Sequence, residues 1–111
     1  PEQVDADIAT GLAECLAAGT TLLGDITAGG ASWSALAHAP VLAVVYKELI
    51  GLDRDAATAA WVRIEDSPEL ATETCRRGVS PHAPYSVHGN TARGIFAAGL
   101  QSATHVAESD A

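Results

Sequence analysis

The sequence predicts an α/β fold in which about four parallel strands alternate with helices. Four short runs rich in β-branched and other apolar residues are separated by segments whose apolar residues recur at helical spacing. The strand runs are almost continuously apolar, as is typical of parallel strands that helices cover. Each run also ends on polar residues. This alternation predicts βαβ units joined by right-handed crossovers.

The first half of the chain contains two of the expected strands. Ile8, Leu12 and Leu16 share one helical face, and Gly19 suits the left-handed residue that ends a helix. The stretches TTLLGDI and VLAVVYKELIG have the composition of buried strands. The expected elements are a helix over residues 5–18, a strand over 20–26, a short helix from Ser32 or Ser34 through His38, and a strand over 41–51.

The second half contains the other two strands. Asp53 is placed to cap a helix, and Ser67 followed by Pro68 has the form of an N-cap and first helical residue. Gly78 and Gly99 suit helix ends. The expected elements are a helix over 54–65, a helix from Ser67 to about Arg77, a short strand within VSPHAPYSV (79–87), a helix from Asn90 to Ala98, and a last strand from Ser102 to about Ala107.

Length and charge exclude several classes of partner. The 111 residues suffice for one domain at most, and the formal net charge is -8. Binding to nucleic acid or to an anionic membrane surface requires a basic surface, so neither is expected. Cys15 and Cys75 form no C-x-x-C pair and are typical of buried thiols in a reducing compartment, so a cytoplasmic protein is expected. No stretch predicts a membrane span or a signal peptide.

Polar residues end each predicted strand, and the carboxyl ends of parallel strands meet at one face. They are Asp25, Lys47 and Glu48, His82 and Tyr85, and His105 and Glu108. Two of these have a purely structural alternative that concerns their charge: Asp25 as a carboxylate bound by backbone N–H groups, and Lys47 with Glu48 as a local ion pair. His38 and His88 are expected in loops or at the surface.

His105 and Glu108 form the most informative pair. A neutral imidazole binds divalent metals, and a nearby carboxylate can transfer a proton between water and a leaving group. His82 lies in a loop that Pro81 and Pro84 stiffen, which suits a substrate contact and equally suits a structural turn. Considered alone, His105 could also be a hydrogen-bonded core histidine, and Glu108 a solvated carboxylate.

Three stretches together resemble the amidohydrolase superfamily, in its cytosine deaminase and chlorohydrolase branch. They are GLAECLAAGTTLLGDIT, GVSPHAPYSV and THVAES, and YKELIGL fits between them in the same order. Within that branch, the residues of GTTLLGDI and PHAPYSV resemble those of aminofutalosine or adenosine deaminases. The resemblance implies that residues 1–111 are one segment of a metal-dependent (β/α)8 barrel, covering about its second to fifth strands and incomplete at both ends.

The resemblance also implies roles for individual residues. His105 would bind one divalent metal ion, usually Zn or Fe, and Glu108 would transfer protons. His82 and Tyr85 would contact a small N-heterocyclic or nucleoside-like substrate. The absence of a lysine at the end of the third predicted strand, where relatives with two metal ions carry one, favours a single ion. The family's His-x-His pair and later aspartate ligand are missing, and a catalytic zinc normally needs three protein ligands.

Two other readings remain. The chain would be a truncated, non-catalytic α/β module that needs a partner chain or self-association, because unpaired strand edges and an apolar sheet surface favour pairing. Homo-oligomerisation is also open for the enzyme. An open-sheet nucleotide binder is the least favoured, because no G-x-G-x-x-G or P-loop motif follows a strand.

Overall fold

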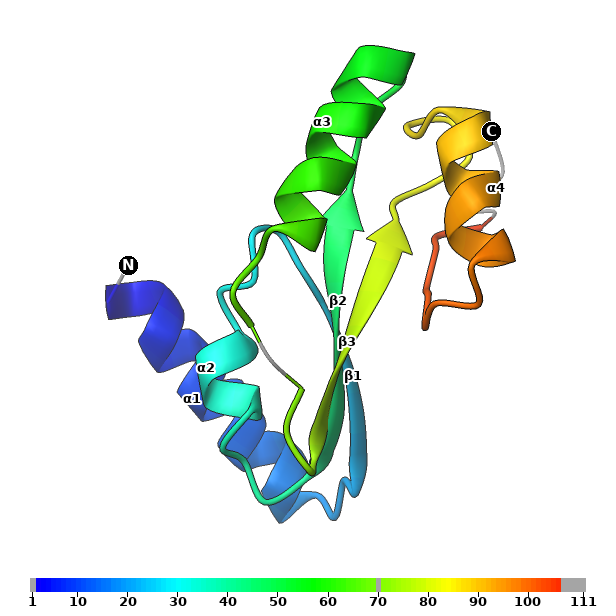
Figure 1. The fold of residues 1–111 in the computed structure, drawn as a ribbon. Coiled ribbons are helices and arrows are strands. Elements are labelled where there is room, and N and C mark those ends of the chain that lie inside the picture. The colour runs from blue at the N-terminus through cyan, green and yellow to red at the C-terminus, as the bar shows by residue number, and fades with distance from the viewer. Residues whose placement is uncertain (1, 70, 107–111) are drawn as a thin grey trace.

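The computed structural model describes residues 2–69 and 71–106 as a parallel sheet flanked by helices (Figure 1). The strands β1 (Leu22–Thr27), β2 (Leu42–Leu49) and β3 (Cys75–Pro81) pair in the order β1-β2-β3. The helices are α1 (Glu2–Ala17), α2 (Trp33–Leu36), α3 (Arg54–Glu65) and α4 (Gly89–Ala97). The expected α/β class with parallel strands is confirmed, and the described residues form three strands where about four were expected.

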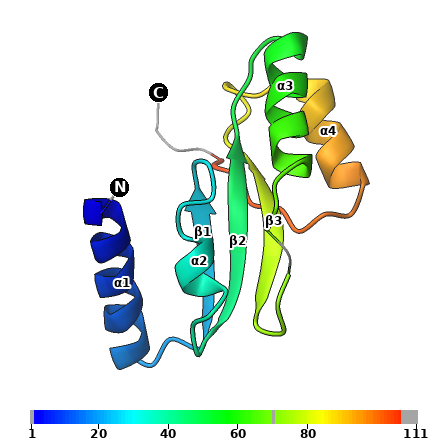
Figure 2. The ribbon, with the colours of Figure 1, turned by 60° about the vertical axis from the view of Figure 1, so that its left-hand side comes forward.

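The two faces of the sheet have different neighbours. Along the central strand β2, side chains alternate between buried and partly or fully exposed positions, because successive residues of a strand point to opposite faces. Ala43, Val45 and Leu49 belong to the buried set, which packs under helices. Figure 2 shows α2 and α3 lying in front of this helix-covered face, with α4 beside α3. We call the opposite side, which contains Val44 and Glu48, the open face.

Two clusters of buried side chains hold the helices to the sheet. One lies toward the amino ends of the strands and joins Leu36, Ala37, Ala43, Val45 and Cys75. The other lies toward the carboxyl ends and joins Leu49, Ala60, Ile64, Val79, Val87 and Ile95. The second cluster fastens α3 and α4 to the ends of β2 and β3, which is where the polar strand-end residues lie.

Local signals in the sequence set most of the helix ends. The Asp53 carboxylate accepts a hydrogen bond from the Ala56 backbone N–H at 2.8 Å and caps α3, as expected. Gly19 and Gly99 follow α1 and α4 with φ values of 84° and 68°. Only glycine adopts this left-handed region at little cost, which explains why both helices end there. α4 begins at Gly89 with His88 as its N-cap residue, two residues before the expected cap at Asn90.

The helix expected from Ser67 to about Arg77 is wrong. The Ser67 hydroxyl donates instead to the Ile64 carbonyl at the end of α3. The Cys75 N–H is accepted by the Thr72 hydroxyl in a turn, and β3 begins at Cys75. Pairing of β3 with β2 starts at Ala43 and Cys75, both almost fully buried. Burial and strand pairing have therefore overridden the local helix-start signal.

The expected fourth strand is also corrected. Within the described residues, Ser102 forms only an isolated parallel bridge with Val79. The Val79 N–H donates to the Gln101 carbonyl and the Ala103 N–H donates to the Val79 carbonyl. Residues 101–105 thus run beside β3 in the parallel direction without forming a regular strand.

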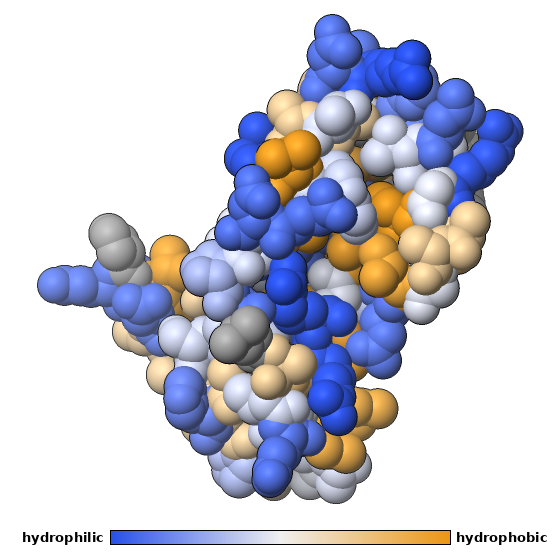
Figure 3. Space-filling model, viewed as in Figure 1, coloured by the Kyte–Doolittle hydropathy of each residue, from blue (hydrophilic) through white to orange (hydrophobic). Residues whose placement is uncertain are grey.

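Polar and apolar side chains both reach the surface. Figure 3 shows hydrophilic side chains over much of this view, with apolar patches over α3 and beside α4. Val62 of α3 and Phe96 of α4 are about half exposed. Among residues 2–69 and 71–106, no helix is both long enough and apolar enough to cross a bilayer.

Candidate active site

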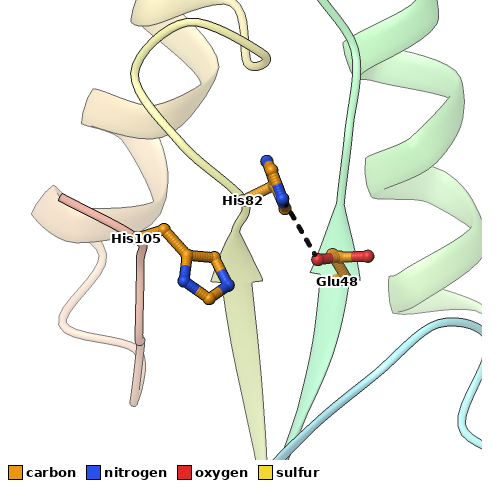
Figure 4. Close-up of side chains that lie close together, drawn as sticks. All are labelled: Glu48, His82 and His105. Atoms are coloured by element: carbon orange, nitrogen blue, oxygen red, sulfur yellow. Dashed lines mark ion pairs between the residues drawn. The ribbon is translucent and has the colours of Figure 1, made fainter. Parts of the chain in front are cut away.

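Three side chains meet at the carboxyl ends of neighbouring parallel segments (Figure 4). Glu48 is near the end of β2, His82 follows β3 directly, and His105 lies in the segment beside β3. One ligand atom from each residue lies within 4.8 Å of the others, and all three residues are partly buried. We call this group the strand-end cluster. Figure 4 shows the two imidazoles and the carboxylate converging from three different segments.

The strand-end cluster has the chemistry of a metal-ligand set. Nε2 of His82 is 3.8 Å from Oε1 of Glu48, and the His82 and His105 ring centroids are 5.2 Å apart. Imidazole and carboxylate ligands bind zinc at about 2.0–2.2 Å. A cation or a hydrogen-bond-donating group between Glu48 and His82 fits the observed 3.8 Å gap, whereas a direct hydrogen bond between them does not.

The main chain determines the spacing of the two histidines. The His82 N–H donates to the Leu49 carbonyl at 3.0 Å, and the His105 N–H donates to the His82 carbonyl at 2.8 Å. The Thr104 hydroxyl adds a hydrogen bond to the Pro81 carbonyl at 2.5 Å. The backbone of His82 is thus bonded to β2 on one side and to residues 104–105 on the other.

A serine holds the ring of His82. Nδ1 of His82 is 2.7 Å from Oγ of Ser86, and the Ser86 hydroxyl also reaches the Ala83 carbonyl at 3.2 Å. The Tyr85 ring approaches the His82 ring edge-on, with centroids 6.1 Å apart. Tyr85 is 61% exposed, so its ring lies at the rim of the strand-end cluster.

The candidates from the sequence divide into those that meet and those that do not. His82 and His105 come together, with Tyr85 beside them. Glu108 lies outside the described residues. Asp25 accepts a short hydrogen bond from the Ser32 hydroxyl. His38 is exposed, as expected, and His88 precedes α4.

Glu48 is the cluster member whose role sequence reasoning missed, because it was considered as a local partner of Lys47. That ion pair is wrong. Lys47 lies on the helix-covered face, where its ammonium is 2.7 Å from the carboxylate of Glu69. The period-two alternation of a strand places consecutive residues on opposite faces, and this signal was available in the sequence.

Glu69 provides the counter-charge of Lys47 on the helix-covered face. Burial alone would raise the pKa of Glu69, but hydrogen bonds from Lys47 and Ser67 and the nearby Lys47 charge together lower that pKa below its usual value.

A hollow of about 680 Å³ adjoins Lys47, Glu69 and the end of α3. Glu48 touches this hollow, but His82 and His105 do not line it.

Comparison with solved structures finds the same fold within a larger protein. The structure is similar to Helicobacter pylori aminofutalosine deaminase, with a TM-score of 0.62 and 23% sequence identity over 77% of this chain. The same enzyme in complex with methylthio-coformycin matches with a TM-score of 0.62 and 23% identity over 76% of this chain. No protein-family model matches the sequence, and no curated protein does.

The extent of the match defines what it establishes. The chain spans 23% and 22% of the length of these two deaminase chains. At this identity the likeness establishes a shared fold over about three quarters of the chain. Because one fold can host many unrelated reactions, the residues of the strand-end cluster bear on function more directly than the fold does.

Proposed function

We propose that this chain is a segment of a metal-dependent hydrolase that acts on C–N bonds and deaminates an N-heterocyclic or nucleoside-like substrate. The observation that carries the proposal is the meeting of Glu48, His82 and His105 at the carboxyl ends of neighbouring parallel segments. Enzymes built as (β/α)8 barrels place their reactive groups at that face. The likeness to part of a deaminase chain and the resemblance of THVAES and SPHAPYS to amidohydrolase motifs support the same reaction class.

The residues fit the metal ion that this function requires. Two imidazoles and a carboxylate suit a divalent ion such as Zn or Fe. In the proposal, His105 is the metal ligand that this chain supplies, and further ligands come from outside these residues. The ion, when bound, would activate water for attack on the carbon that carries the leaving amino group.

The chain's own side chains have separate tasks in this proposal. Glu108, three residues after His105 in the sequence, transfers the proton from water to the leaving group, a task that a carboxylate can perform. His82 and Tyr85 contact the substrate at the rim. The two prolines around His82 restrict its backbone and so keep the contact in position.

Two variants of the full-length protein test these roles. His105→Ala should lose most of its metal, because it removes a ligand. Glu108→Gln should keep its metal and lower turnover by about 10²–10⁴-fold, since it removes a proton-transferring group. Metal content is measured by elemental analysis, and turnover by ammonia release from amino-substituted heterocycles. His38→Ala, at an exposed position, serves as the control.

The outcomes separate the parts of the proposal. Full metal content in His105→Ala would contradict ligation. Unchanged turnover in Glu108→Gln would contradict proton transfer by Glu108. If the unmodified full-length protein binds no metal and releases no ammonia from any substrate tried, the hydrolase proposal itself fails.

A second candidate function is association without catalysis, and one observation favours it. Leu22 of β1 and Leu42 of β2 lie opposite each other and are 65% and 55% exposed on the open face, and among residues 2–69 and 71–106 no strand pairs with the outer edge of β1. Exposed apolar side chains at a strand edge promote pairing with another chain. Light scattering of the 111-residue chain tests this function: a stable monomer would contradict self-association, and a dimer would support it.

A further inference from the structure

The two ring nitrogens of His82 have different surroundings. Nδ1 is within hydrogen-bond distance of the Ser86 hydroxyl, at 2.7 Å. Nε2 faces the Glu48 carboxylate at 3.8 Å, which is too far for a hydrogen bond. A neutral imidazole carries one proton, on one nitrogen only, and the hydrogen bonds of the other groups decide which.

Counting protons at Ser86 decides the tautomer. The Ser86 hydroxyl has one proton, and the Ala83 carbonyl at 3.2 Å can only accept it. If the hydroxyl donates to Ala83, its oxygen accepts from Nδ1–H of His82, and both contacts become hydrogen bonds. If the hydroxyl instead donates to Nδ1, the Ala83 contact is lost as a hydrogen bond, and a proton on Nε2 has no acceptor within range at Glu48. The first arrangement makes more hydrogen bonds.

This tautomer gives the strand-end cluster a defined polarity. Nε2 of His82 then carries a lone pair and lies near a carboxylate, so two hydrogen-bond acceptors face each other across 3.8 Å. The neighbouring Lys47 does not neutralise them, because its ammonium pairs with Glu69 on the helix-covered face. Two facing acceptors are favourable only when a donor group or a cation lies between them.

We propose that Ser86 is a positioning residue that holds His82 as the Nδ1-protonated tautomer, so that Nε2 of His82 and the Glu48 carboxylate together bind a hydrogen-bond-donating group of the ligand. An amino group or ring N–H of an N-heterocycle is a group of this kind. The ligand class rests on the proposed function, whereas the tautomer rests on the geometry of this chain alone.

Nuclear magnetic resonance of the 15N-labelled 111-residue chain tests the tautomer directly. Two-bond 1H–15N correlations distinguish an imidazole protonated at Nδ1 from one protonated at Nε2. A His82→Gln variant assigns the resonances among the four histidines. The wild-type chain should show His82 protonated at Nδ1. Protonation at Nε2 would overturn the proposal.

Ser86 variants test whether this serine is the cause. Ser86→Ala should shift His82 toward the Nε2-protonated form, and Ser86→Thr, which keeps the hydroxyl, should retain the wild-type pattern. Ser34→Ala, at an exposed serine, is the matched control and should change nothing. If Ser86→Ala leaves His82 protonated at Nδ1 in a folded chain, Ser86 does not position the ring.

The same variants separate this inference from the proposed function. In the full-length protein, Ser86→Ala should lower kcat/KM about 10-fold with metal content unchanged, and Ser86→Thr should restore it. A correct tautomer response without any deaminase activity would leave the role of Ser86 standing and contradict the proposed function. Full activity in Ser86→Ala would contradict the role of Ser86 in recognition.

Discussion

The two faces of the sheet differ in what they contribute. The helix-covered face buries Val45, Leu49 and Val79 against helices, and its one lysine, Lys47, is neutralised by Glu69. The open face leaves Leu22 and Leu42 exposed.

The strand-end cluster shows the same contrast in its polar groups. Glu48 faces two imidazoles across distances that are too long for direct hydrogen bonds. The charged Lys47 of one face is therefore paired within the chain, and the other face presents groups that a ligand or further structure can bind. The adjacent residues Lys47 and Glu48 show the contrast within a single dipeptide.

The largest effect is expected from a matched pair of valines on β2. Val45 is 1% exposed and packs in the buried cluster at the amino ends of the strands, with Ala43 and Cys75. Its neighbour Val44 is only partly buried on the open face. Val45→Ala should lower the free energy of unfolding by about 2–3 kcal/mol, from lost burial and a residual cavity. Val44→Ala should cost well under about 1 kcal/mol. Urea denaturation of both variants measures the difference.

The same pair tests whether the open face becomes the interior of a barrel. In the full-length protein, closure of a barrel would bury Val44, and the two variants should then cost similar amounts. If Val44→Ala and Val45→Ala lower the free energy of unfolding equally in the 111-residue chain, the open face is covered in that chain. The two faces would then not differ in burial.

A smaller effect is expected from two glycines that flank Tyr46 on the open face. A Cβ at Gly78 would lie 2.4 Å from the Tyr46 ring, and a Cβ at Gly24 would lie 3.5 Å from it. Gly78→Ala should therefore cost about 1–2 kcal/mol through overpacking. Gly24→Ala should be neutral or slightly stabilising, because the contact is ordinary and the unfolded chain loses freedom. Equal thermal stability of the two variants would show that Tyr46 moves aside freely.

The smallest effect concerns acid stability on the helix-covered face. Because the pKa of Glu69 is lowered in the folded chain, the unfolded chain binds its proton more readily. The stabilising contribution is therefore present above the ordinary carboxyl value of 4.5 and is lost as the pH falls below it. Glu69→Gln should flatten this part of the stability profile, measured by denaturation from pH 6 to pH 3 (about the range of carboxyl titration). Glu73→Gln, at an exposed glutamate, is the control, and an equal flattening there would contradict the prediction.

Local patterns predicted much of the fold correctly. Helical spacing located α1 and α3, and the apolar runs located β1 and β2. The Asp53 cap and the helix ends at Gly19 and Gly99 follow from short-range chemistry that a sequence displays directly. The helix expected after Ser67 failed, because the start of β3 depends on pairing with β2, which no local window contains.

The site was predictable in part for the same reason. His82 and His105 follow from motifs, and their convergence follows from parallel topology. The place of Glu48 depends on which face of β2 it occupies, and the bond between His82 and Ser86 depends on the turn between them. The role of Glu108 stays a prediction.

The main-chain hydrogen bonds around His82 have a consequence for how such a protein can change. Because the Leu49 carbonyl and the His105 N–H fix the backbone at position 82, the spacing of the strand-end cluster does not depend on which side chains it carries. These main-chain hydrogen bonds would remain if the side chains at positions 48, 82 and 105 were replaced. A lineage or a designer could thus exchange one reaction for another here by point substitutions, without rebuilding the scaffold that holds them.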